Sequence, residues 1–180
     1  MERLDESVAD TIRVLAQSVQ DLGWRVCLEG ACPTPLTRNQ FLILNLLDAR
    51  GARPIGEIAS LLDISSPAAS KNIDRLQQLG MVERRHRPTD RRVHEVAIQA
   101  EGRDVVERFV TAASARDLQL LERFSQDEKE LLLGLLRRVV HLALRAEKRL
   151  DAICLQCYRR HGEDCVVRDL VGECLHDSEH

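Results

Sequence analysis

The most constraining feature of this sequence is a pair of short helical segments joined by a tight turn. Residues 54–62, PIGEIASLL, predict a short helix that begins at a proline. Ser65 or Ser66 can cap a second helix, which the three- and four-residue spacing of apolar side chains predicts over residues 68–79, before Gly80. Two helices in this arrangement are typical of a helix-turn-helix.

After the second helix the apolar pattern changes from a helical period to that of strands. Residues 82–84 and 93–98 are short β-prone runs, and a Pro-Thr-Asp sequence between them supplies turn residues. Residues 84–92 contain five arginines and one aspartate. The sequence therefore predicts a hairpin with arginines at its tip, which completes a winged helix-turn-helix.

The segments before this unit predict further helices. Apolar residues at helical spacing predict an amphipathic helix over residues 4–22, with Gly23 as its stop. Residues 25–36 contain one glycine and two prolines, and we expect a linker there. Thr37 and Gln40 have the spacing of a capping box and open the next helix.

Two long helices are expected after the hairpin. Apolar repeats predict one from Gly102 to Phe124 and another over residues 127–150, the second opened by Ser125 and Glu128 as a capping box. The apolar stripe of the second helix is wide, which indicates a helix-packing or dimer face. The predicted fold is mainly α with a small β-hairpin wing: a winged helix-turn-helix plus a helical dimerisation region.

Composition excludes several classes of function. Aromatic residues are only 3% of the chain, too few for the rows of stacking rings that single-strand binders use. No apolar run approaches the length of a membrane span, and the N-terminus is charged and amphipathic rather than a signal peptide, so we expect a soluble, cytoplasmic protein. No Gly-rich phosphate loop or catalytic triad stands out, so we expect no enzyme.

The predicted winged helix-turn-helix suits double-stranded DNA. A capped helix fits a major groove about 12 Å wide, and its outward Ser, Lys and Arg side chains can meet phosphates and base edges. The arginine-tipped hairpin can reach the neighbouring minor groove. A winged helix that contacts proteins, with merely solvated arginines, is the alternative. The candidate DNA-binding residues are Ser65, Ser66, Pro67, Ser70, Lys71, Arg75, Arg84, Arg85, Arg87, Asp90, Arg91 and Arg92.

Residues 55–84, IGEIASLLDISSPAASKNIDRLQQLGMVER, and the Asp-Arg-Arg sequence at residues 90–92 closely resemble the MarR family of bacterial transcription regulators. The order of the predicted elements fits that family over residues 5–150. The family's wing carries an Asp-x-Arg signature. The resemblance therefore implies that Arg92 enters the minor groove and that Asp90 holds it in place.

The resemblance also implies a homodimer joined through its first and last helices, in agreement with the wide apolar stripe. Two recognition helices related by a two-fold axis would bind a pseudo-palindromic operator with half-sites about one turn apart. The family follows its wing with Leu-Thr and then Gly, whereas residues 98–102 here are Ile-Gln-Ala-Glu-Gly, without the threonine cap. The expected division is 1–36 for a dimerisation helix and linker, 37–100 for the DNA-binding domain, 101–150 for dimerisation helices and 151–180 for a cysteine-rich tail.

Four of the six cysteines lie in that tail, at Cys154, Cys157, Cys165 and Cys174. In a chain with no export signal thiols stay reduced, so their C-x2-C-x7-C-x8-C spacing indicates metal or redox chemistry. One pair and two single cysteines favour an iron–sulfur cluster. A zinc site, which usually presents two pairs, a thiol–disulfide switch, which needs only two cysteines, and small buried thiols are the alternatives.

Other residues could take part in such a site. His161 and His176 are candidate substitute ligands, and Cys27 and Cys32, in the expected linker, could join the site or be ordinary. A tail of this composition is not expected to bury enough apolar area to fold unaided, so metal ligation would supply its folding free energy. Because the tail follows the dimerisation helix, its ordering could reset the spacing of the two recognition helices.

The sequence therefore predicts a dimeric DNA-binding regulator, a repressor, whose operator affinity is controlled by an iron–sulfur cluster. One alternative is a repressor that responds to a small phenolic or lipophilic effector, bound between the DNA-binding and dimer regions, with a structural zinc site in the tail. A thiol-based redox-sensing regulator is another. An enzyme with a Cys154–Cys157 dithiol is disfavoured, because no βαβ pattern surrounds these cysteines.

Overall fold

The computed structural model describes residues 2–87, 90–145, 150–157 and 165–171. This part of the chain is mainly helical and contains a two-stranded antiparallel hairpin, which confirms the predicted fold class. No helix among these residues is long and apolar enough to cross a membrane. In chain order the elements are α1 (Glu2–Ala31), α2 (Arg38–Arg50), α3 (Ile55–Leu62), α4 (Ser66–Gln78), β1 (Val82–Arg87), β2 (Asp90–Ile98), α5 (Ala100–Leu120), α6 (Gln126–Leu144), α7 (Leu150–Cys157) and α8 (Arg168–Val171).

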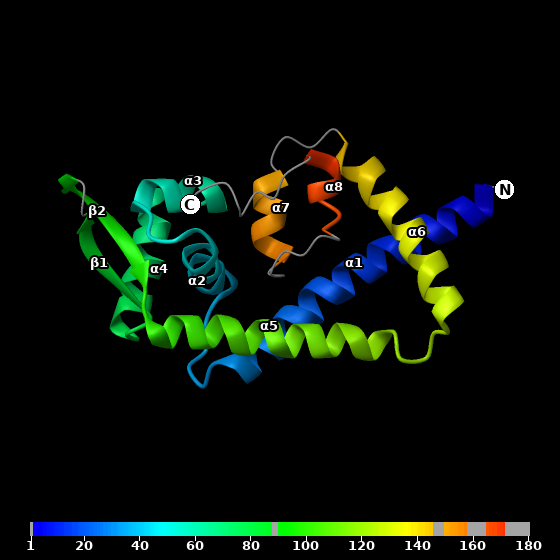
Figure 1. Ribbon diagram of the computed structural model, residues 1–180, viewed down its shortest axis with the longest axis horizontal. Coiled ribbons are helices and arrows are strands. Elements are labelled where there is room, and N and C mark those ends of the chain that lie inside the picture. Colours follow the sequence, from blue (N-terminus) through cyan, green and yellow to red (C-terminus); the bar gives the residue numbers. More distant parts are fainter. Residues whose placement is uncertain (1, 88–89, 146–149, 158–164, 172–180) are drawn as a thin grey trace.

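The molecule is elongated, with a compact lobe at one end (Figure 1). Helices α2, α3 and α4 and the hairpin form this lobe, and α5 runs from the hairpin along the length of the molecule toward α6 at the other end. Helix α1 packs against α5. The DNA-binding elements that the sequence predicts are therefore held together in one lobe, and α5 joins this lobe to the rest of the predicted dimerisation region.

Helix α1 is longer than the sequence predicts, because tertiary packing continues its apolar face. The predicted stop at Gly23 is wrong, because α1 runs without interruption to Ala31. Of the linker predicted over residues 25–36, only residues 32–36 lie outside a helix. Gly23 is buried, and the guanidinium of Arg116 from α5 lies where a side chain would otherwise project. Arg108 of α5 donates from Nε to the Ala31 carbonyl at 2.9 Å, where α1 ends.

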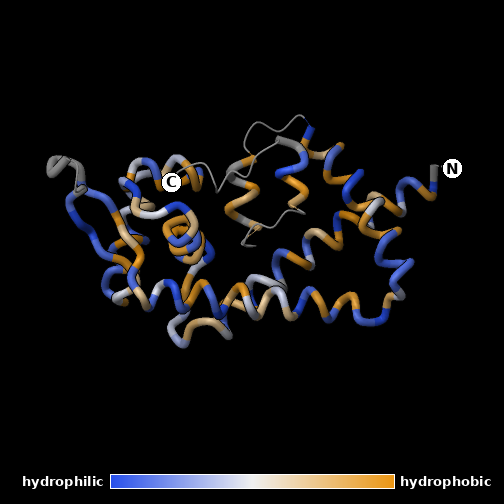
Figure 2. The backbone as a smooth tube through the Cα atoms, in the orientation of Figure 1, coloured by the Kyte–Doolittle hydropathy of each residue, from blue (hydrophilic) through white to orange (hydrophobic). Residues whose placement is uncertain are grey.

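The core is centred on α2 and on three aromatic rings from three helices. Trp24 of α1 lies 5.1 Å from Phe41 of α2 and 5.0 Å from Phe109 of α5, and the two phenylalanine rings are 4.1 Å apart, measured between ring centroids. In α2 every residue from Gln40 to Leu47 is buried, whereas an amphipathic helix would bury only one face. Neighbouring helices pack on several sides of α2, whose middle is strongly apolar in Figure 2.

Both predicted capping boxes are present. The Thr37 hydroxyl accepts from the Gln40 backbone N–H at 3.3 Å, and the Thr37 N–H donates to the Gln40 side chain at 2.9 Å. Ser125 and Glu128 repeat this arrangement at the start of α6, with distances of 3.3 and 2.8 Å. The backbone N–H and the hydroxyl of Ser125 both donate to the carboxylate of Glu128 and lower its pKa.

The helices after the hairpin differ from prediction at their ends and in their exposure. Helix α5 begins at Ala100, without a side-chain cap from Gln99, and ends at Leu120, while α6 ends at Leu144. None of the described α6 residues is buried. We call the exposed large apolar side chains of α1 and α6 the α1/α6 apolar face. They are Leu4, Val8, Ile12, Val14 and Leu15 of α1, and Leu131, Leu133, Leu135, Leu136, Val139 and Leu142 of α6.

Helix α7 lies in the predicted tail and packs on the lobe, against α2 and α3 (Figure 1). Leu155 is fully buried and belongs to the main core, and Cys154 is also buried. The expectation that the tail buries too little apolar surface to fold unaided is therefore wrong for α7, because the lobe provides a surface that covers it.

Candidate nucleic-acid interface

The turn between α3 and α4 is built from backbone hydrogen bonds. Asp63 ends α3 in the left-handed region, with φ 55° and ψ 44°, and its N–H donates to the carbonyls of Ala59 and Ser60. Aspartate tolerates this conformation better than most residues other than glycine. The Ile64 N–H also donates to the Ala59 carbonyl, at 3.0 Å. These bonds close the turn and fix the direction in which α4 begins.

Helix α4 is capped by Ser65 and carries Pro67 in its first turn, as predicted. The Ser65 hydroxyl accepts from the Ala68 N–H at 3.3 Å, which settles the choice between the two neighbouring serines. Ala69, Ile73 and Leu76 are buried against the lobe. The opposite side of the helix is open to solvent and carries most of the candidate contacts. Ser66, Pro67, Lys71 and Arg75 are exposed there, and Ser70 is half-buried.

The end of α4 is tied to the hairpin and to α5. Gly80 has a φ of +71° and its N–H donates to the Gln77 carbonyl, and the Met81 N–H donates to the Leu76 carbonyl, both at 3.0 Å, as in a Schellman motif. The Met81 carbonyl then accepts from the Gln99 N–H at 2.9 Å. Gly102, in the first turn of α5, lies so close that an added Cβ would be 2.5 Å from the same carbonyl oxygen.

The hairpin pairs β1 with β2 from Val82 opposite Ile98 out to Arg87 opposite Asp90, with a shift in register after His86. The loop before α3 adds an isolated β-bridge to β2 that the sequence pattern does not predict. The Arg53 N–H donates to the Val96 carbonyl at 3.1 Å, and the Val96 N–H donates back at 2.8 Å. A single bridging residue close to a glycine and a proline carries no periodic signal, so the pattern could not reveal it.

Arg84 connects the hairpin to α4. Its Nη2 donates to the Asp74 carboxylate at 2.6 Å and lies 3.4 Å from the Ser70 hydroxyl. The sequence predicts Arg84 and Ser70 as DNA contacts. The structure brings them together with Asp74, so in the free protein Arg84 braces the wing against α4.

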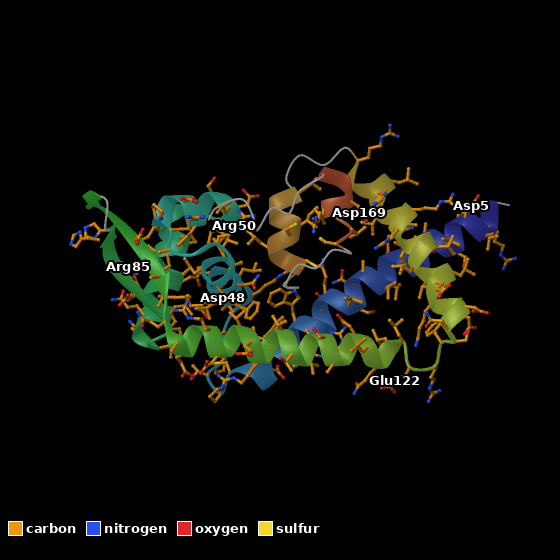
Figure 3. The ribbon with its side chains drawn as sticks, in the orientation of Figure 1. Asp5, Asp48, Arg50, Arg85, Glu122 and Asp169 are labelled. Carbon is orange, nitrogen blue, oxygen red and sulfur yellow. The ribbon has the colours of Figure 1, made fainter. Side chains whose placement is uncertain are left out.

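Arg85 makes a second ion pair, across the hairpin. Its Nε donates to Glu95 at 2.9 Å, and the two residues are directly opposite in the strand register. The Glu95 side chain is only 6% exposed and that of Arg85 is 48% exposed. Arg85 lies on the hairpin at the edge of the molecule (Figure 3). A buried carboxylate requires a partner, so Arg85 holds Glu95 while much of its own side chain faces solvent.

Beyond this pair, His86 and His94 face each other across the strands, with ring centroids 4.3 Å apart. Neither histidine was among the candidate residues that the sequence indicated. Arg87 belongs to β1, and Asp90, Arg91 and Arg92 belong to β2. The structure describes the backbone of these four residues but not their side chains. The minor-groove role of Arg92 therefore stays a prediction.

The candidate cysteine ligands differ in their surroundings. Cys154 is buried, Cys157 is exposed and Cys165 is half-buried, whereas Cys174 lies outside the described residues, as do His161 and His176. Among the described residues, no three His, Cys, Asp or Glu side chains are placed together as a metal would require. The metal site therefore stays a prediction that rests on cysteine spacing.

Cys27 lies on α1 and Cys32 directly follows that helix, and both are buried in the main core. Burial raises the pKa of the Cys27 thiol, and this effect outweighs the opposing charge and hydrogen bond of Arg116. Both cysteines therefore have an ordinary packing role as small buried side chains.

A groove with a volume of ≈ 480 Å³ lies beside α5, near the end of α1. It is bordered by Asp104, Glu107, Arg108 and Thr111, with Gly30, Ala112 and Ala115 between them. The phenolic or lipophilic effector of the alternative interpretation stays a prediction.

Comparisons with known proteins match this architecture. A sequence profile of the MarR family matches residues 34–93, from just before α2 into β2. The uncharacterised HTH-type transcriptional regulator YsmB of Bacillus subtilis is 27% identical over 139 residues, which cover 76% of this chain and 92% of YsmB. These matches agree with a transcriptional regulator and not with an enzyme.

Two solved structures share the fold. YusO of Bacillus subtilis superposes with a TM-score of 0.68 at 21% identity, covering 78% of this chain and 97% of YusO. A mutant of MepR from S. aureus, solved bound to an oligodeoxyribonucleotide, gives a TM-score of 0.61 at 19% identity, covering 76% of this chain and 97% of that one.

Proposed function

We propose that this chain, which carries the winged helix-turn-helix of the MarR family, is a homodimeric, cytoplasmic transcriptional regulator that binds double-stranded DNA through α4 and the hairpin. The observation that carries the proposal is the outward side of α4. Its capped first turn, Lys71 and Arg75 are exposed together, next to an arginine-rich hairpin that ion pairs hold in place.

In this mechanism α4 enters the major groove of the operator. The first turn, around Ser66 and Pro67, approaches the backbone, while Lys71 and Arg75 reach phosphates and base edges. The hairpin extends to the neighbouring minor groove, where Arg92, by its resemblance to the family signature, would insert. We propose that this binding represses transcription by occupying the operator.

The α1/α6 apolar face supports the dimer. It presents many large apolar side chains to solvent, and Leu142, for example, is 73% exposed. Large apolar side chains exposed in such number favour a protein contact over a free surface. A two-fold arrangement through these helices would place two copies of α4 on a pseudo-palindromic site, with half-sites about one helical turn apart.

DNA binding is tested with a duplex selected from a random library, titrated at several salt concentrations. Replacing Lys71 or Arg75 with Ala should weaken binding and lower the slope of log affinity against log salt by about 1 for each phosphate that the variant no longer neutralises. Arg123→Ala, an exposed arginine after α5, is the matched control. The proposal fails if the protein binds no duplex at low salt, or if the control weakens binding equally.

The dimer is tested by sedimentation over a range of protein concentrations. Leu142→Glu places a charge within the α1/α6 apolar face and should shift the protein to monomers, with a parallel loss of DNA affinity. An unmodified protein that stays monomeric at micromolar concentrations would contradict the dimer.

We further propose that Cys154, Cys157, Cys165 and Cys174 hold an iron–sulfur cluster that controls operator affinity, with zinc as the alternative. The support is their spacing, together with the position of Cys154 and Cys157 three residues apart on α7. The described residues do not place three ligands together, so they add no geometric support. When bound, such a cluster would make the folding of the tail sensitive to iron and oxygen.

This part is tested by measuring iron, sulfide and zinc in protein purified without oxygen, together with its absorption spectrum. Iron with sulfide, absent from Cys157→Ser, supports the cluster. Zinc without iron supports the structural zinc site, and a small-molecule effector would then be sought. The absence of both metals would overturn the cofactor and leave thiol chemistry as the sensing mechanism.

A further inference from the structure

Helix α7 returns from the far end of the molecule to the DNA-binding lobe. After α6, helix α7 (Leu150–Cys157) packs against α2 and α3. Helix α3 is the helix that precedes the turn into α4. Leu155 has no exposed surface and belongs to the same core as the helix-turn-helix, and Cys154 is 3% exposed. The contact therefore joins the cysteine-bearing tail directly to the lobe.

A buried hydrogen bond fixes this contact. Asn45 lies in the middle of the buried run of α2 and is 7% exposed. Its side-chain Nδ2 donates to the Leu155 carbonyl at 2.9 Å, across 110 positions of sequence. A polar amide in an apolar core is costly unless it is hydrogen-bonded. The docked α7 therefore supplies the hydrogen-bond acceptor that the buried Asn45 side chain needs.

The two cysteines of α7 differ in their burial. Cys154 is buried, whereas Cys157, the last residue of the helix, is exposed. A chemical change at Cys157 therefore acts on a helix whose Leu155 is part of the core of the DNA-binding lobe.

We propose that α7 is a latch on the helix-turn-helix: its docking on α2 and α3, held by Leu155 and the Asn45 hydrogen bond, sets the affinity of α4 for DNA. Cysteine chemistry in the tail then acts through release or retention of α7, and not through the spacing of the dimerisation helices. This inference rests on the proposed function in one respect, namely that α4 binds DNA.

Docking is tested without DNA, in reduced full-length protein freed of metal by a chelator. Alkylation by iodoacetamide is followed at each cysteine by mass spectrometry. Cys154 should react at least about tenfold more slowly than Cys157, because a buried thiol reacts only when the structure opens locally. Buried Cys32 serves as an internal reference. Equal rates at Cys154 and Cys157 would show that α7 is not docked and would overturn the latch.

The latch is then weakened from each side. Asn45→Ala and Leu155→Ala should each speed alkylation of Cys154 by about tenfold, with Cys32 unchanged. Val106→Ala, a core truncation in α5, is the matched control for general destabilisation and should change both cysteines equally or not at all. If neither variant affects Cys154 selectively, these residues do not hold α7 and the proposal fails.

DNA affinity is measured for the same proteins with the selected duplex, at equal folded fractions. Both latch variants should change affinity by about fivefold or more, while Val106→Ala should not. If Cys154 is selectively released but affinity stays at the control value, α7 is docked without regulating, and the latch is refuted while DNA binding stands. If the unmodified protein binds no duplex, both proposals fall and the alkylation result still describes the docking.

Discussion

Gly102→Ala gives a direct test of how closely α4, the hairpin and α5 are joined. Alanine in the first turn of a helix normally stabilises relative to glycine, by up to about 1 kcal/mol. At Gly102, however, the new Cβ would lie 2.5 Å from the Met81 carbonyl oxygen, 2.9 Å from Ile98 Cγ1 and 3.1 Å from Leu44 Cδ2. Two of these neighbours are themselves fixed in the core, and the oxygen accepts the Gln99 hydrogen bond.

Forcing an extra methyl group into a well-packed site costs about 1–3 kcal/mol. We therefore expect Gly102→Ala to lower the free energy of unfolding by about 1–2 kcal/mol, although helix propensity alone would predict an increase. Urea unfolding at fixed protein concentration measures this change, provided that the m-value is the same.

Gly56→Ala is the matched control, because Gly56 also lies in the first turn of its helix and an added Cβ there meets nothing within 4 Å. It should leave stability unchanged or raise it by up to about 0.5 kcal/mol. A Gly102→Ala variant as stable as this control would refute the claim that α5 is wedged against the turn after α4.

Three further predictions concern a cap, an ion pair and a buried thiol. Ser65→Ala should cost about 1 kcal/mol in urea unfolding, against less than about 0.5 for Ser66→Ala, and equal costs would contradict the assignment of the cap. Arg85→Ala should destabilise by about 1 kcal/mol in urea unfolding, because the nearly buried Glu95 carboxylate loses this partner; an unchanged stability would argue against the ion pair. The raised pKa of Cys27 means that, above pH 9.0, the unfolded chain loses this proton before the folded chain does, so stability falls as pH rises. Cys27→Ala should flatten that fall in unfolding titrations, and an unchanged slope would rule out this contribution.

Local signals in the sequence were sufficient to predict most of the fold. The capping boxes at Thr37 and Ser125, the cap at Ser65 and the change from helical to strand periodicity after Met81 depend on residues only a few positions apart. Each of these features is decided by short-range hydrogen bonds and turn preferences, which a pattern along the chain can represent.

The failures of prediction arise from contacts between distant segments. Gly23 suggests a helix end, but Trp24 and Cys27 continue the apolar face of α1 and pack in the core, which outweighs the low helix propensity of glycine. The hydrogen bond between Asn45 and Leu155 spans most of the chain, and no local pattern around either residue indicates it.

The candidate DNA contacts were predicted unevenly for the same reason. The exposure of Lys71 and Arg75 follows from helical periodicity and was predictable. The arginines of β1 could be counted from the sequence, but their carboxylate partners could not be assigned. Asp74 lies on another element, and Glu95 became identifiable only once the register of the hairpin was known.

The aromatic cluster of the core gives this protein an intrinsic optical reporter. Trp24 is the single tryptophan of the chain, and its ring touches Phe41 of the DNA-binding lobe and Phe109 of α5. Its fluorescence therefore comes from the joint between the lobe and the long helices, without any added label. An emission spectrum that shifts when a duplex or a metal is added would report a rearrangement around Trp24, and an unchanged spectrum would indicate that the packing at this joint is kept.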